Sequence, residues 1–130
     1  MAGTFKFELV TPERMTLSQD ANQVVVPGLE GDFTVLAGHA PVISALRPGV
    51  VDVTLPDGRK TRIFVKGGFA EVDAEHLTVL VERALEVEGM DAAIIAAELA
   101  VAEADLASAT DDTARLAAAA ALDRLKGLNA

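Results

Sequence analysis

The chain has 130 residues, enough for one ordinary domain or for a small domain with an appended segment, and too few for a second full catalytic domain. Its formal net charge of −9 argues against binding to nucleic acid or to an anionic membrane surface, because those partners need a clustered basic face. The sequence contains no cysteine, so disulfides, thiolate catalysis and cysteine-ligated metal sites are excluded.

Residues 4–88 are typical of short β-strands separated by turn residues. The clearest signal is the Pro-Asp-Gly turn at 56–58, which joins two segments of alternating polarity and predicts a β-hairpin. Gly67 and Gly68 predict a bend or a close backbone approach that a Cβ atom would obstruct. We count about ten such segments. Strands this short, joined by tight turns, favour a ten-stranded antiparallel β-sandwich over a parallel α/β sheet.

The composition changes after Gly89, where proline and aromatic residues disappear and alanine, the best helix former, dominates. Apolar residues recur at helical spacing in two stretches, Ile95, Leu99, Ala102 and Leu106 in the first and Ala118, Leu122, Leu125 and Leu128 in the second. Gly127 is predicted to end the second helix. We therefore predict a mainly β protein with two domains, a sandwich at 1–88 and a C-terminal antiparallel two-helix hairpin at 89–130.

The position of this hairpin is left open by the sequence. Isolated helices of fewer than roughly 15 residues are marginal in water, and alanine buries little apolar area. The hairpin therefore needs a surface, which is either the sandwich or a partner along which it extends.

No arrangement of residues predicts catalysis, a metal site or a cofactor site. His39 and His76 are the only histidines and lie far apart, no phosphate-binding loop precedes a helix, and no serine stands in a nucleophile elbow. A sandwich enzyme would need a pocket that brings one of these histidines to an acid. We also expect no secretory leader, because no basic segment precedes an apolar run, and no membrane insertion.

Five motifs of the β region resemble, in order, the epsilon subunit of the F-type ATP synthase, which is called delta in mitochondria. They are FELVTPE at 7–13, VVVPGLEGDF at 24–33, GHAP at 38–41, LRPGV at 46–50 and FVKGGFAEV at 64–72. Each motif is modest alone, but the set in this order is highly specific. The resemblance covers nearly the whole β region.

The resemblance implies a non-catalytic rotor subunit of the central stalk that couples the gamma subunit to the ring of c subunits during proton-driven ATP synthesis. It also implies a ten-stranded sandwich with a two-helix domain, no cofactor, and a peripheral location in the F1 sector on the cytoplasmic face of the bacterial inner membrane. Contact of the hairpin with the catalytic alpha and beta subunits is a further expectation.

Two sets of site residues follow from the resemblance by position. Glu30 and Asp32, at the tip between Gly28 and Phe33, are the candidates for contacting the polar loops of the c ring, where opposite charge would favour binding. His39, Ala40 and Pro41 resemble the stretch that approaches gamma. For His39, a role in merely ordering a tight loop stands beside the interface role.

The C-terminal region departs from the pattern of family members that sense ATP. Their first helix begins with an Ile-Asp-x-x-Arg-Ala motif, whereas this chain has MDAAII at 90–95, which keeps Asp91 and places Ile94 where the arginine would stand. A polyphosphate would meet carboxylates without compensating cations, at Asp91, Glu98, Glu103 and Asp105.

Residues 89–130 carry seven acidic and three basic side chains, a net charge of −4, whereas inhibitory tails in the family are typically basic. We therefore expect the hairpin to be a weak inhibitor of ATP hydrolysis or none. The alternative is a nucleotide-sensing regulatory subunit whose hairpin binds ATP and inhibits hydrolysis.

Overall fold

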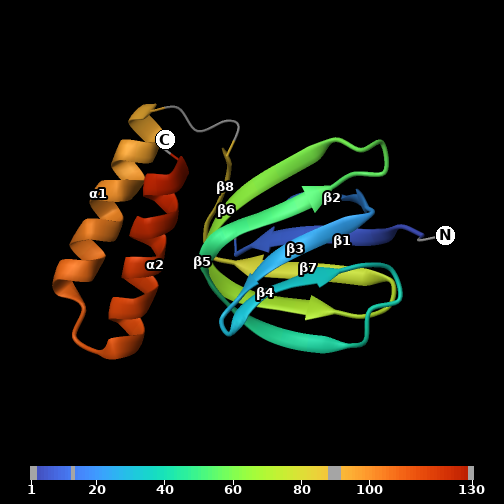
Figure 1. The fold of residues 1–130 in the computed structure, drawn as a ribbon, viewed down its shortest axis with the longest axis horizontal. Helices are drawn as coiled ribbons and strands as arrows, with labels where there is room; N and C mark the ends of the chain where they lie inside the picture. Colours follow the sequence, from blue (N-terminus) through green and yellow to red (C-terminus); the bar gives the residue numbers. More distant parts are fainter. Residues whose placement is uncertain (1–2, 13, 88–91, 129–130) are drawn as a thin grey trace.

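The computed structural model describes residues 3–12, 14–87 and 92–128, and it places a helical hairpin across one end of a β-sandwich (Figure 1). In chain order the elements are β1 (Phe5–Thr11), β2 (Arg14–Ala21), β3 (Gln23–Gly28), β4 (Gly31–Val35), β5 (Val42–Thr54), β6 (Lys60–Val72), β7 (His76–Val81), β8 (Ala84–Glu86), α1 (Ala92–Ser108) and α2 (Asp112–Leu128). The predicted β-sandwich followed by two helices is confirmed. The predicted domain boundary between 88 and 89 lies outside the described residues.

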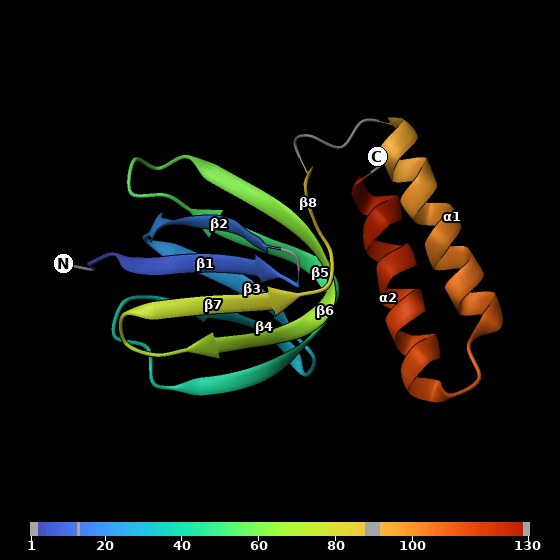
Figure 2. The same ribbon diagram turned by 180° about the vertical axis from the view of Figure 1, so that it is seen from behind.

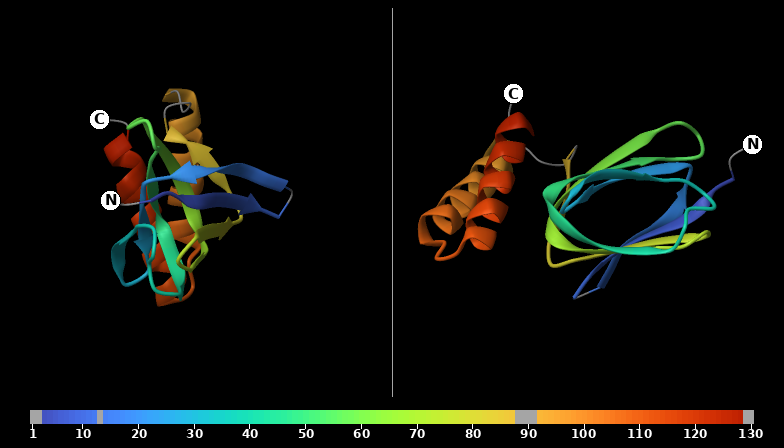
Figure 3. Two further views of the ribbon diagram at one scale, coloured as in Figure 1. Left: turned by 90° about the vertical axis from the view of Figure 1, so that its right-hand side faces the viewer. Right: turned by 60° about the horizontal axis from the view of Figure 1, so that its bottom comes forward.

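The strands form one hydrogen-bonded sheet in the order β2-β1-β7-β6-β5-β3-β4, with β8 paired to β6. The sheet curls onto itself, so that the strands enclose a flattened oval in the right-hand view of Figure 3. All pairs are antiparallel except β1 with β7, which run parallel from Lys6 beside His76 to Val10 beside Leu80. Parallel neighbours need a long connection, and the strands between β1 and β7 supply it.

The structure has eight strands among its described residues where the sequence predicts about ten. The break predicted at Gly67 and Gly68 is a bend within one continuous strand, β6. β5 and β6 have 13 residues each, and they stay paired on both sides of a bend between the Leu46–Gly68 and Pro48–Lys66 pairs. Gly68 has φ +133, and a Cβ atom there would lie 2.1 Å from the carbonyl oxygen of Leu80. The glycines therefore allow the bend, as predicted, without ending the strand.

The predicted turn at 56–58 is confirmed. Gly58 has φ +90, and the backbone N–H of Leu55 donates to the carbonyl oxygen of Arg59 at 2.8 Å. The turn closes the hairpin between β5 and β6 at the end that lies away from the helices (Figure 1).

The core of the sandwich consists of inward-facing side chains from β1 and β3 to β7, together with Ala21 of β2. Alternation along β1 is typical, with Phe5, Phe7 and Leu9 buried and Lys6 exposed. The other buried members are Ala21, Val24, Val26, Val35, Leu46, Val51, Val53, Ile63, Val65, Ala70, Val72, Leu77, Val79 and Val81. The sandwich thus has an apolar core of its own, aliphatic and aromatic.

The hairpin is docked on the sandwich, which decides between the two positions that the sequence left open. A second apolar cluster joins Phe64 of β6 to side chains of both helices, with Val50 and Val87 at its border; its helical members are Leu99, Ala102, Leu106, Ala121, Leu122, Leu125 and Leu128. Seen from behind, α2 lies between α1 and the sandwich (Figure 2). The predicted stripes therefore face the contact. α2 continues through Gly127 to Leu128, so the prediction that Gly127 ends it is wrong.

Candidate interaction surfaces

An apolar row faces solvent on the outer side of the sheet. Its members are cross-strand neighbours on four strands: Ala45 on β5, Phe69 on β6, Leu80 on β7 and Val10 on β1. Phe69 is 55% exposed, and Leu80 is exposed beside it. A contiguous exposed apolar patch on a small protein is typical of a surface that binds another protein. We call these four residues the outer row.

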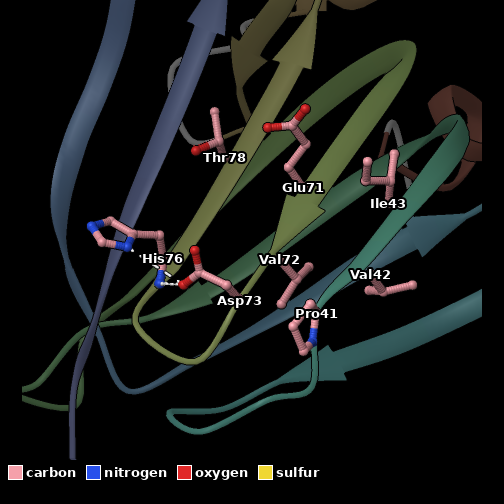
Figure 4. A pocket seen from close by; sticks show the side chains of 8 residues that line it. All are labelled: Pro41, Val42, Ile43, Glu71, Val72, Asp73, His76 and Thr78. Atoms are coloured by element: carbon pink, nitrogen blue, oxygen red, sulfur yellow. Dashed lines mark hydrogen bonds and ion pairs between the residues drawn. The ribbon is translucent and has the colours of Figure 1, made fainter.

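A groove of about 560 Å³ lies two residues further along the same strands from the outer row. Figure 4 shows its lining side chains. Its lining residues are Pro41, Val42, Ile43, Glu71, Val72, Asp73, His76 and Thr78. Ile43, Glu71 and Thr78 come from three neighbouring strands and stand in one row parallel to the outer row. Ile43 is 71% exposed, so the apolar surface continues from the outer row into this groove.

Two polar groups of the groove, Asp73 and His76, lie at the turn between β6 and β7 and bond within that turn. The Asp73 carboxylate accepts hydrogen bonds from the backbone N–H groups of Glu75 and His76, each at 2.8 Å, and its Oδ1 lies 3.4 Å from Nδ1 of His76. These hydrogen bonds stabilise the carboxylate and hold the pKa of Asp73 below its ordinary value, the one from Glu75 contributing most and the one from His76 next. These contacts order the turn between β6 and β7 and leave the groove as a binding surface of mixed polarity.

The loop at 38–41 borders the same groove. Gly38 has φ +84 and donates its N–H to the carbonyl oxygen of Ala74 at 2.8 Å. Nδ1 of His39 lies 2.7 Å from the carbonyl oxygen of Ala40, and its ring centroid lies 6.4 Å from that of Phe33. His39 is half-buried and orders the loop, while Ala40 and Pro41 are exposed.

The turn between β3 and β4 lies at the other end of β4, beside the hairpin (Figure 1). It carries Leu29, which is 62% exposed, and both Glu30 and Asp32, which are exposed. Asp32 accepts a hydrogen bond from Arg47, whereas the described residues offer Glu30 no hydrogen bond or ion pair. The two predicted sets of site residues therefore form two separate surfaces.

A buried carboxylate connects α1 to the sandwich. Glu98 is only 4% exposed, and its two oxygens lie 3.2 Å from Nζ of Lys66 and 2.8 Å from Nη2 of Arg83. The sequence interpretation counted Glu98 among acids without compensating cations, and this was wrong, because both cations come from the sandwich. A buried charge needs such partners.

The stretch at 90–95, which stands where ATP-sensing family members have their motif, is described only from residue 92 onward. Ile94 lies in the first turn of α1 and is exposed, whereas Asp91 lies outside the described residues. Their predicted loss of nucleotide binding stays a prediction.

The described part of the chain has neither a cluster of metal-ligating side chains nor a helix that could span a membrane. No three side chains of His, Asp or Glu gather there in a way that could hold a metal ion. None of the helices described has the length and apolar character needed to cross a bilayer.

Comparison with known proteins gives a family match over the sandwich. Residues 4–87 match the family model of the ATP synthase delta/epsilon chain, β-sandwich domain. Over 128 residues the chain is 46% identical to the ATP synthase epsilon chain of Parvibaculum lavamentivorans, covering 98% of this chain and 97% of that protein. It is 45% identical over 130 residues to the epsilon chain of Maricaulis maris, covering 100% of this chain and 97% of that one.

Solved structures resemble the whole fold. A chain of the Euglena gracilis mitochondrial ATP synthase, in a structure of its OSCP, F1 and c ring, superposes with a TM-score of 0.74 at 25% identity, over 97% of this chain and 79% of that one. A chain from the central stalk and c ring of the Tetrahymena thermophila mitochondrial ATP synthase superposes with a TM-score of 0.66 at 12% identity, over 99% of this chain and 98% of that one. At this identity the match shows a likeness of fold alone.

Proposed function

Because this chain belongs to the delta/epsilon family of ATP synthase subunits, we propose that it is a central-stalk rotor subunit that joins gamma to the c ring and has no catalytic site of its own. The observation that carries the proposal is the pair of separate exposed surfaces on one sandwich, at opposite ends of β4. A coupling subunit needs two such surfaces, because it transmits torque from one partner to another.

The gamma surface in this proposal combines the loop at 38–41 with Ile43 and the outer row. Phe69 and Ile43 are large apolar side chains, and such residues dominate binding energy at the centre of protein interfaces. Pro41 links the loop to the groove that contains Ile43. In the complex, His39 orders the loop while Ala40 and Pro41 contact gamma.

The c-ring surface is the turn between β3 and β4. Glu30 supplies a carboxylate that has no partner in the described chain, and Leu29 supplies apolar area beside it. Asp32 contributes with its charge partly neutralised by Arg47. Such a surface suits the polar loops of the c ring.

The hairpin is a weak inhibitor of ATP hydrolysis or none. Both Lys66 and Arg83 pair with Glu98, and Phe64 is buried beneath the helices, so leaving the docked position would expose apolar area and separate these charges. The net charge of −4 over 89–130 also opposes binding to acidic loops of the catalytic alpha and beta subunits. The chain therefore has two domains, 1–88 for coupling and 89–130 as an accessory.

Nucleotide sensing is the second candidate function, because ATP-sensing members of the family keep Asp91 as this chain does. The exposed Ile94 in place of an arginine disfavours it. Saturable binding of ATP to the isolated chain would support this second function instead. In either case the subunit lies peripherally in the F1 sector, on the cytoplasmic face of the bacterial inner membrane.

The test of the gamma surface is a matched pair of variants. Ile43 and Leu116 are each 71% exposed, but Leu116 lies on the hairpin. Ile43→Asp should weaken binding to gamma by about tenfold or more, because a charge would be buried at the interface. Leu116→Asp should bind as the wild type does. Equal binding by both variants, measured with purified gamma, would remove this surface from the proposal.

A further inference from the structure

One arginine connects the two sides of the turn between β3 and β4. Arg47 lies at the bend of β5, between the residues that pair with Gly68 and Lys66. Its Nη1 donates to the carbonyl oxygen of Gly28 and its Nη2 donates to Oδ1 of Asp32, each at 2.5 Å. The two acceptors stand before and after the tip, so the guanidinium spans the base of the turn.

The backbone of the turn is also bonded to β5, the strand that carries Arg47. The N–H of Leu29 donates to the carbonyl oxygen of Ala45 at 2.8 Å. A Cβ atom at Gly28 would lie 2.6 Å from the carbonyl oxygen of Gly31, so the two limbs of the turn are in close contact. Leu29 and Glu30 form the exposed tip of the turn, and Gly31 and Asp32, which follow them, are exposed as well.

The same contacts give the two acidic residues of the turn, Glu30 and Asp32, different surroundings. Arg47 takes Asp32 as its partner, and its side chain is 35% exposed. Among the described residues Glu30 has no cationic partner, and it stands next to the exposed Leu29. A partner that fits this tip offers a cationic or polar group beside a small apolar surface.

We propose that Arg47 is a positioning residue that fixes the turn between β3 and β4 and thereby presents Leu29 and Glu30 to the c ring. The proposal rests on the proposed function, which places the c ring at this turn. A planar guanidinium can bond two acceptors at once in fixed geometry, which a lysine ammonium does less well. Exposed ion pairs contribute little to overall stability. Removing Arg47 should therefore change the conformation of the turn more than the stability of the chain.

The chain offers a matched control. Arg59 also pairs with an aspartate on an exposed turn, with its Nε 2.6 Å from Oδ2 of Asp57. That contact stays within one turn, two residues apart, whereas Arg47 reaches across 19 residues to Gly28 and 15 to Asp32. Arg59→Ala removes similar chemistry at a turn that faces neither the hairpin nor the tip.

The experiment measures the position of the tip in the assembled enzyme. Because the chain has no cysteine, Leu29→Cys introduces a single thiol at the tip, to which a short photoreactive maleimide is attached. Cross-linking to the c subunit is then compared in membranes that carry Leu29→Cys alone or with Arg47→Ala, Arg47→Lys or Arg59→Ala. ATP-driven proton pumping and the melting temperature of each isolated chain are measured in parallel.

Arg47→Ala should lower the cross-linking yield severalfold and reduce pumping, with a melting temperature close to that of Arg59→Ala. Arg47→Lys should restore only part of the yield, and Arg59→Ala should leave it unchanged. A yield for Arg47→Ala equal to that of the parent, or full restoration by Arg47→Lys, would overturn the role given to Arg47. Absence of any cross-link from Leu29→Cys alone would instead overturn the c-ring contact in the proposed function.

Discussion

The sandwich and the hairpin bury their apolar side chains in different ways. The sandwich closes a core around large aliphatic and aromatic residues of its own strands, such as Phe7 and Leu9. The hairpin contributes mostly alanine and leucine, and its cluster is completed by Phe64 of the sandwich. The sandwich therefore defines its own structure, whereas the position of the hairpin depends on a surface and on charges that the sandwich provides.

The largest expected effect comes from the core of the sandwich. Phe7→Ala should lower the free energy of unfolding by about 3–5 kcal/mol, because it leaves a cavity where the ring is fully buried. The helices should unfold together with the strands in urea, since they lose their docking surface. A hairpin that stayed helical after the sandwich had unfolded would contradict this dependence.

A substitution on the helical side of the contact should loosen the hairpin alone. Leu125 of α2 is fully buried, and Leu125→Ala should cost about 2–5 kcal/mol of docking free energy while the sandwich stays folded. Amide exchange should accelerate in residues 92–128 and stay slow in β5, β6 and β7. Leu116→Ala, on the exposed side of α2, should change the exchange little. Equal loss of protection in both regions would show that they unfold as one unit.

The ion pairs of Glu98 should have a smaller effect that is again confined to the hairpin. Glu98→Gln keeps the volume but removes the charge that Lys66 and Arg83 share, and hydrogen bonds to charged groups contribute about 1.5–3 kcal/mol. Arg83 is largely exposed, so we expect a value near the lower end. Amide exchange of α1 measures it, and Glu103→Gln, at an exposed position on the same helix, is the control. Identical exchange in the two variants would contradict a structural role for these ion pairs.

The smallest effect concerns pH and the turn between β6 and β7. The pKa of Asp73 lies below its ordinary value of 3.8 in the folded chain, because the N–H of Glu75 and then that of His76 stabilise the carboxylate. This contribution to stability is present above pH 3.8 and is lost as the pH falls through the lower folded pKa. The melting temperature of Asp73→Asn should therefore fall slightly less steeply with decreasing pH than that of the wild type. An identical fall in both proteins would contradict the lowered pKa of Asp73.

The sequence predicts local structure well where one pattern determines it. Alternation of Phe5, Phe7 and Leu9 indicates a strand with one buried face, and the helical spacing of Leu122 and Leu125 indicates the buried side of α2. Alternation does not say whether a strand ends or bends, so the bend of β6 at Gly67 and Gly68 reads in the sequence as a break between two strands. The parallel pairing of β1 with β7 is equally hidden, because it joins segments far apart in the chain.

The interaction surfaces were harder to predict. His39, Ala40 and Pro41 came from the family resemblance, but Phe69 looked like an ordinary strand residue, since only the pairing shows that its face is uncovered. Glu98 looked like one acid among several. Its cations stand 15 and 32 residues away in the sequence, and no local pattern indicates such partners.

The central claim is that the sandwich couples gamma to the c ring and that the hairpin is an accessory. It is tested most directly by assembling the enzyme with a chain that lacks residues 89–130 and measuring ATP hydrolysis together with ATP-driven proton pumping. We expect the truncated chain to assemble with gamma and the catalytic subunits, to keep pumping coupled to hydrolysis, and to leave the rate of hydrolysis nearly unchanged. A severalfold rise in hydrolysis, or a loss of pumping, would contradict it.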